Sequence, residues 1–340
     1  GITARTIDTH TDLTGDSTAV MDFAAALLRQ TAESEGVLLS PVSVLYALGM
    51  TANGASGDTL TQLEQVMGMD LTALNDYLYT YRMSLPENTK KCKLSLANSL
   101  WLRDIFRVDD AFLDTCANYY GAEAYRSAFD DSLVTDLNRW VDNKTDGMIS
   151  SLLNQPPTDR TMLYLVNAVC FDAKWQEPYE KSDIEQGATF TAADGVRQTA
   201  DLLWSKESVY LSADNTTGFM KYYDGGRYAF VALLPSEGVS IADYVAGLTG
   251  GKLHALLNEH RYGTVEAAIP GPSQPEGWPE EEQRRWHDLV DRCDYETVVQ
   301  DHYDAGCMQR RNRYMVDHAA MLIAVHDGQS GGTRRTIEYA

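Results

Sequence analysis

The residues of this 340-residue chain best suited to binding chemistry form a glycine-rich turn. The apolar run Met321–His326 predicts a buried parallel strand, and Thr333–Ala340 predicts the start of a helix. Between them lie Gly328, Gly331 and Gly332. Backbone N–H groups of Gly331, Gly332 and Thr333 would there face an anion at a helix N-terminus. A glycine-rich connection that binds no ligand is the alternative, and it stays open.

Other reactive side chains lack the spacing that catalysis or metal binding requires. Ser40 and Ser43 lie in no Gly-x-Ser-x-Gly turn, which argues against a hydrolase. The five cysteines form neither a Cys-x-x-Cys pair nor a zinc pattern, and Cys170 in its apolar run is expected to be a core thiol. We therefore expect no catalytic residue, no metal, no cofactor and no enzymatic activity.

The elements that must position these residues indicate an α+β protein. Apolar spacing predicts helices over 17–31, 71–85, 109–120, 135–153 and 241–257, with Ser17 capping the first. Strands are expected over 94–102, 161–172, 187–204 and 228–235. Helices followed by strands with long connections do not form a regular βαβ repeat.

One helix pair has clear boundaries in the sequence. Ser40 is a suitable N-cap, and Pro41 suits the first helical position because its missing N–H has no partner there. The small and apolar residues that follow predict a helix buried on most sides. Gly54 and Gly57 should end it, and Asp58 is expected to cap the next helix.

Five segments occur in the order and at the spacing of one known family. They are the pair at 39–63, the strand at 94–102, the helix at 136–149 with Asn143-Lys144-Thr145-x-Gly147, the strand at 163–171 with Asn167 followed by Trp175, and 228–235 ending in Leu-Pro235. This series resembles the serpin family over about residues 1–265. The resemblance implies helices around a large mixed sheet, with 136–153 lying over 163–171. Trp140 and Trp175 are expected to be substantially buried, because each lies among apolar neighbours and has a large apolar area. It implies structural roles for Ser40, Pro41, Asn53, Gly54, Asn143, Thr145, Gly147, Asn167, Trp175 and Pro235.

The remaining segment, 266–340, is similar to a different family. Its Pro270-x-x-x-Gln274, Met308-x-Arg310-Arg311-Asn312 and Gly331-Gly332-Thr333 runs resemble the C-terminal half of YpsA-like proteins of the SLOG superfamily. That resemblance implies a partial Rossmann-like α/β fragment and a ligand site that includes Arg310, Arg311, Asn312, Gly328, Gly331, Gly332 and Thr333. Every lysine lies at or before Lys252, which also indicates a change of origin. We therefore expect a chimera of an incomplete serpin fold, 1–265, and a Rossmann-like fragment, 266–340.

The serpin resemblance also predicts what the chain can do. Intact family members inhibit serine or cysteine proteases by inserting a cleaved loop into a sheet. Nothing after Pro270 matches the hinge, the reactive loop or the closing strands, so no reactive-loop residue is assigned and no protease partner is expected for this chain. The strand 163–171 would then lie near an unpaired edge that permits self-association. The alternative function is a SLOG-type module that binds a nucleotide-derived ligand on a truncated serpin scaffold.

Charge limits the remaining partners. The formal net charge is −21, and both parts are acidic. This argues against nucleic acid and anionic membranes. No apolar run reaches the length of a membrane span. The serpin part favours an extracellular, bacterial-type secreted protein, whereas the C-terminal family would favour the cytoplasm.

Overall fold

The computed structural model describes residues 6–9, 13–31, 37–191, 195, 197–213 and 215–270. The expected ligand site at Arg310, Arg311, Asn312, Gly328 and Gly331–Thr333 lies outside the described residues, as does the expected Rossmann-like fragment beyond Pro270. The chain divides into two units. The first comprises residues 1–24 and 40–172, and the second comprises 25–39 and 173–340.

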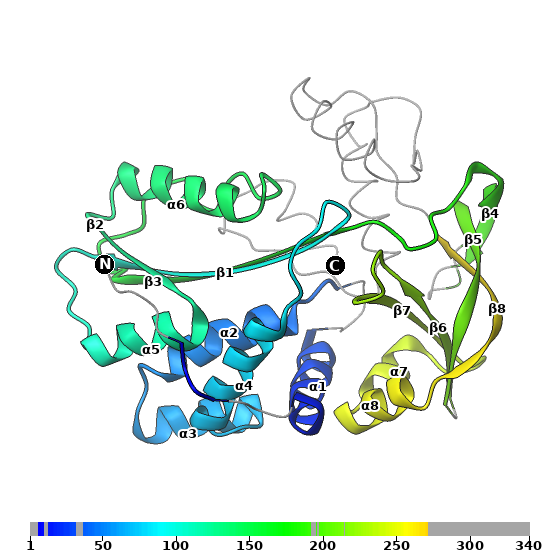
Figure 1. Cartoon of the computed structure of the whole chain (residues 1–340), viewed down its shortest axis with the longest axis horizontal. Helices are drawn as coiled ribbons and strands as arrows, with labels where there is room; N and C mark the ends of the chain where they lie inside the picture. The colour runs from blue at the N-terminus through cyan, green and yellow to red at the C-terminus, as the bar shows by residue number, and fades with distance from the viewer. Residues whose placement is uncertain are drawn as a thin grey trace. The chain divides into compact units, whose positions relative to one another are not determined.

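The first unit is rich in helices (Figure 1). The helices are α1 (Leu13–Thr31), which continues into the second unit, α2 (Pro41–Ala52), α3 (Gly57–Met67), α4 (Leu71–Ser84), α5 (Asp110–Tyr120) and α6 (Asp131–Lys144). The expectation that Ser17 caps α1 is wrong, because the helix already begins at Leu13.

The start of α2 confirms the predicted cap. The Ser43 backbone N–H donates to Ser40 Oγ at 3.3 Å, and Pro41 occupies the first turn. The next cap was predicted wrongly: Ser56, not Asp58, precedes α3, and Asp58 lies in its first turn. An acidic side chain there still favours the helix, since it faces the positive end of the dipole.

Three strands form the sheet of the first unit. They are β1 (Cys92–Arg103), β2 (Glu123–Ser127) and β3 (Leu163–Ala173), in the order β2-β1-β3. Strands β1 and β2 are parallel, with Ser99 opposite Glu123. Helix α6 crosses one face of this sheet, and α2 and α5 lie on the other (Figure 1).

A buried apolar cluster fixes α6 on the sheet, as predicted. Leu133, Leu137 and Trp140 of α6 pack with Val166 and Ala168 of β3. The predicted helix ends are wrong: α6 spans 131–144 rather than 135–153. Burying side chains of this size stabilises a fold by about 1.5–3 kcal/mol each, so this cluster accounts for the position of the helix.

The second unit is built on a five-stranded antiparallel sheet. Its elements are the short 3-10 helix η1 (Lys181–Asp183), the strands β4 (Ile184–Thr191), β5 (Arg197–Ala213), β6 (Thr216–Tyr222), β7 (Ala229–Pro235) and β8 (Arg261–Pro270), and the helices α7 (Ile241–Ala246) and α8 (Gly250–Asn258). The strand order is β4-β5-β6-β7, and β8 also pairs with β5. Leu256 of α8 packs against Val209, Leu211 and Met220 of the sheet.

Strand β5 changes neighbours along its length. Its first part pairs with β4 up to Leu203, and its last part pairs with β6 from Val209 onward. Strand β8 follows β5 from Leu202 to Tyr210. The single strand expected at 187–204 is therefore two strands, and β8 runs unbroken through residue 265. The boundary expected at residue 265 therefore falls inside a strand.

Candidate functional site at the edge of the first sheet

The C-terminal end of α6 is shaped by the motif that the sequence singled out. Thr145 is 1% exposed, and its Oγ1 donates to the Val141 carbonyl at 2.8 Å and accepts from the Ile149 N–H at 3.0 Å. Gly147 has φ +80°, and its N–H donates to the Asp142 carbonyl at 2.8 Å. A buried threonine and a left-handed glycine therefore stop the helix here. Asn143 of the same motif is exposed.

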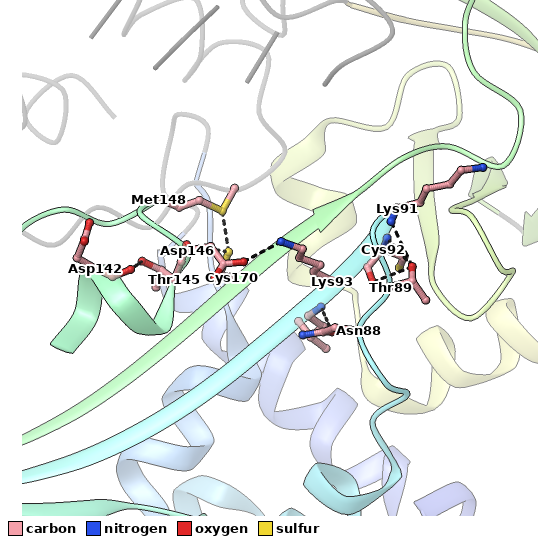
Figure 2. Close-up of polar contacts among 11 residues, drawn as sticks. Asn88, Thr89, Lys91, Cys92, Lys93, Asp142, Thr145, Asp146, Met148 and Cys170 are labelled. Atoms are coloured by element: carbon pink, nitrogen blue, oxygen red, sulfur yellow. Dashed lines mark hydrogen bonds and ion pairs between the residues drawn. The ribbon is translucent and has the colours of Figure 1, made fainter. Parts of the chain in front are cut away.

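Beyond this turn, the chain is held to the sheet by exposed contacts (Figure 2). Lys93 Nζ of β1 lies 2.8 Å from Asp146 Oδ2, with side-chain exposures of 34% and 64%. Cys170 Sγ of β3 lies 2.6 Å from Met148 Sδ. Burial raises the pKa of Cys170, and the nearby carboxylates of Asp172 and Asp146 raise it further. Exposed ion pairs contribute about 0–1 kcal/mol, so this end of α6 is weakly held.

The edge strand β2 supplies a second attachment of α6. Glu123 accepts from Trp140 Nε1 at 2.7 Å, from the Tyr125 hydroxyl at 2.6 Å and from Lys144 Nζ at 2.6 Å. Partial burial alone would raise the pKa of Glu123, but these hydrogen bonds outweigh it and hold that pKa below its ordinary value. Sequence reasoning missed Glu123, because nothing in the local pattern marks a five-residue edge strand.

The opposite edge of the sheet is β3. No strand pairs with its outer side among the described residues. Asn167 Nδ2 donates to Asn98 Oδ1 of β1 at 2.7 Å, and Asn98 Nδ2 donates to the Tyr120 carbonyl at 2.8 Å. Asn167 Oδ1 is buried and has no hydrogen-bond partner within the described part of the chain. An unpaired strand edge and a free acceptor therefore occur on the same strand.

Beneath the sheet, the remaining motif residues position helices. Asn53 Nδ2 donates to the Gly49 carbonyl at 2.8 Å and to Asn75 Oδ1 at 2.9 Å. The Tyr120 hydroxyl donates to the same Asn75 oxygen at 2.5 Å. Gly54 lies in the turn between α2 and α3. These contacts fix α2 against α4 and α5, and none of these groups faces a cavity that the structure shows.

The two motif residues of the second unit have different surroundings. Trp175 stacks on Tyr223, with ring centroids 4.3 Å apart and planes at 10°. Trp140 is 6% exposed, as expected, but Trp175 is only partly buried. The expected substantial burial is therefore met at Trp140 and met in part at Trp175, whose ring also contacts Tyr179 and Phe230. Pro235 ends β7.

Among the described residues, we identify no group of side chains arranged for catalysis. Among them, no group of three or more His, Cys, Asp or Glu side chains could hold a metal ion. Cys92, Cys116 and Cys170 are present as thiols, and burial raises the pKa of Cys116 to about 12. Thiolates are the reactive form, so Cys116 is inert at neutral pH. The predicted core position of Cys170 is only partly correct, because its side chain is not fully buried.

Helices around one sheet, with a helix across its face, and a second sheet that is antiparallel define an α+β protein. A family description, serpin (serine protease inhibitor), matches residues 18–272. The chain belongs to the serpin family.

The relatives include an antichymotrypsin and a corticosteroid-binding globulin. Human alpha-1-antichymotrypsin is 31% identical over 189 residues, covering 52% of this chain and 44% of that protein. Corticosteroid-binding globulin of Oryctolagus cuniculus is 27% identical over 285 residues, covering 78% and 72%. The native-state crystal structure of tengpin, a thermophilic serpin, is 30% identical with a TM-score of 0.74, covering 97% and 89%. The match to the human inhibitor thus spans less than half of its length. No described helix has the length and apolarity of a membrane span.

Proposed function

We propose that this chain is a protease-inhibitor family member that does not itself trap proteases. The proposal rests on our interpretation of the sequence after Pro270, in which we identify no hinge, reactive loop or closing strand. Trapping requires a loop that a serine or cysteine protease cleaves and that then enters the sheet as a new strand. Without such a segment, the protease has no loop to cleave and no strand of this chain can insert into the sheet.

The fold supports a strand-accepting role for what remains. Strand β3 has eleven residues and lies at the edge of its sheet within the described chain. Unpaired backbone groups at such an edge favour pairing with an extended segment of another chain. A solved relative is a loop C-sheet serpin polymer, 36% identical with a TM-score of 0.71. That relative supports self-association in general, and we place it at the open edge of β3 because of the strand order alone.

The test is incubation with trypsin, chymotrypsin, elastase and subtilisin, followed by denaturing electrophoresis. We expect no protease-sized shift with any of them, while human alpha-1-antichymotrypsin run with chymotrypsin serves as the positive control. A detergent-resistant complex with any of the four would overturn the proposal. Size-exclusion chromatography at rising concentration tests the acceptor role: oligomers should grow with concentration and be suppressed by an excess of an extended Thr/Ala/Val peptide.

A second candidate function rests on the YpsA-like motifs. Arg310 and Arg311 would face an anionic group, and Gly331, Gly332 and Thr333 would offer backbone N–H groups to it. Such a module would bind a nucleotide-derived ligand, so the probes are AMP and ADP-ribose in calorimetric titrations. Binding that Arg310→Ala abolishes would support this function, and absence of heat with both probes would exclude it for these ligands.

A further inference from the structure

Strand β5 forms a fork in the second sheet, between its pairing with β4 and its pairing with β6. The fork comprises residues 204–208, which neither β4 nor β6 reaches. Two cavities of about 490 and 430 Å³ open here, and both are lined by Glu177, Lys206 and Lys221. We call them together the fork cavity. Either volume is within the range of small-molecule sites.

A buried ion pair forms the floor of the fork cavity. Lys221 Nζ of β6 lies 2.8 Å from Glu207 Oε1 of β5, and the two side chains are 4% and 9% exposed. The ammonium group also lies over the ring of Tyr179, 4.5 Å from its centroid, and 5.6 Å from the centroid of Trp175. An ammonium group has three donors, so the floor keeps donor capacity beyond its bond to Glu207.

Two hydroxyl groups on the wall have no partner beyond each other. The Tyr179 hydroxyl and Ser205 Oγ are buried and face each other, and neither has a further hydrogen-bond partner in the described part of the chain. Tyr179 is 5% exposed and lines the smaller cavity together with Ser205. A buried polar group left unpaired costs about 1–3 kcal/mol, and native proteins satisfy such groups almost without exception. These hydroxyls therefore indicate a bound molecule that completes their hydrogen bonding.

The charges around the fork cavity select an uncharged occupant. Lys221 is balanced by Glu207, and Lys206 lies 4.0 Å from Glu266 at the exposed rim. The further charges in the lining are Glu177 and Asp183, both acidic. An anion would be repelled by this rim, while a cation would meet the Lys221 ammonium group on the floor.

The rim provides flat apolar surface. Trp204 is 41% exposed and lines the smaller cavity, and Tyr262 is 80% exposed and lines the larger one. Trp204 Nε1 donates to Glu185 Oε2 at 2.8 Å, which restricts the orientation of its ring. Aromatic faces favour stacking with planar molecules.

We propose that the fork cavity binds a small, uncharged, planar organic molecule with a hydrogen-bond acceptor such as a carbonyl oxygen. The acceptor reaches the donors of Tyr179, Ser205 and Lys221, and the planar body lies against the ring of Trp204, which lines the same cavity. This site is separate from the edge of β3, so it does not depend on the proposed function.

The probe for the test is 6-propionyl-2-(dimethylamino)naphthalene, a neutral aryl ketone whose emission responds to hydrogen bonding at its carbonyl oxygen. We expect saturable binding to the full chain with a shifted emission maximum. Tyr179→Phe removes one hydroxyl and should weaken binding about fivefold, as expected for one lost hydrogen bond. Tyr244→Phe, in α7, is the matched control and should leave the affinity unchanged, since Tyr244 lines neither cavity.

A second variant tests the same site without depending on whether Tyr179→Phe disturbs the fold. Ser205→Ala removes the other hydroxyl with a minimal change of volume, and should also weaken binding and reduce the emission shift. Unfolding profiles of both variants establish that they are folded. Equal affinity of the wild type, Tyr179→Phe and Ser205→Ala would overturn the proposal, as would the lack of saturable binding, which would mean that water alone satisfies the hydroxyls.

Discussion

Replacing Lys221 by methionine should destabilise the second unit strongly. Methionine keeps most of the apolar stem but removes the ammonium group that lies 2.8 Å from Glu207. Because Glu207 is only 9% exposed, its carboxylate would remain in a poorly hydrated site without a counter-charge. Breaking a buried pair in this way costs about 3–5 kcal/mol. Since a folded domain is stable by about 5–15 kcal/mol, this is a large fraction of the total.

Removing both charges should restore most of that loss. The double variant Lys221→Met/Glu207→Leu has no buried charge to desolvate, and apolar replacements of buried pairs are often neutral or stabilising. We expect its free energy of unfolding to lie within about 1–2 kcal/mol of the wild type. The cost of the double variant should therefore be far below the sum of the costs of Lys221→Met and Glu207→Leu made singly.

Urea denaturation, followed by tryptophan fluorescence and circular dichroism, measures these differences. Lys206→Met is the matched control, because Lys206 and Glu266 are 4.0 Å apart and 75% and 71% exposed. An exposed pair contributes about 0–1 kcal/mol, so this control should hardly move the midpoint. If Lys221→Met costs no more than Lys206→Met, or if the double variant costs the sum of its parts, the reasoning is refuted.

Three further substitutions test the first unit. Glu123→Gln should lower the free energy of unfolding by about 1 kcal/mol. Because the pKa of Glu123 is lowered in the folded state, the contribution of its carboxylate is present above about pH 5 and is lost on acidification. The urea denaturation curves of wild type and variant should therefore converge at low pH. Gly49→Ala places a carbon 2.6 Å from the Tyr120 hydroxyl oxygen and should cost about 1–3 kcal/mol of stability. The control Gly251→Ala has open space around the added carbon and should not destabilise the protein. Equal melting temperatures of the two variants would contradict this. Leu137→Ala empties a fully buried position and should cost about 2–5 kcal/mol in urea denaturation, against less than about 0.5 kcal/mol for the exposed Asn143→Ala; similar values would show that α6 is not held by its apolar face.

Helix starts were predicted better than helix ends. Ser40 and Pro41 carry a local signal, so the start of α2 is correct. The end of α6 was placed nine residues late because Ile149, Leu152 and Leu153 continue an apolar pattern beyond Lys144. The helix stops earlier since Gly147 takes φ +80° and Thr145 turns its hydroxyl back to the backbone. The position of such a helix end depends on backbone geometry, which the spacing of apolar residues does not predict.

Strands were harder, because pairing joins residues that are distant in sequence. The expected strand 187–204 combined β4 with the first part of β5, since Gly195 in the turn interrupts the pattern only briefly. Strand β2 was missed because five residues carry little periodicity. Strand β6 was missed because Gly218 and Lys221 break its alternation. Gly218 is required there, as any side chain would collide with the backbone of Ala232 in β7.

The residues that sequence patterns missed are the ones that make the sites. Glu123, Glu207 and Lys221 are charged residues within strands, where an isolated pattern predicts a solvent-facing position. Each is instead satisfied by a partner that only the fold supplies: Glu123 by α6, and Glu207 and Lys221 by each other across neighbouring strands. A charge in a strand costs free energy unless such a partner exists. Among the described residues, the fork of β5 is a place where buried charges meet this cost through partners that the fold supplies, and it is there that we place a ligand site.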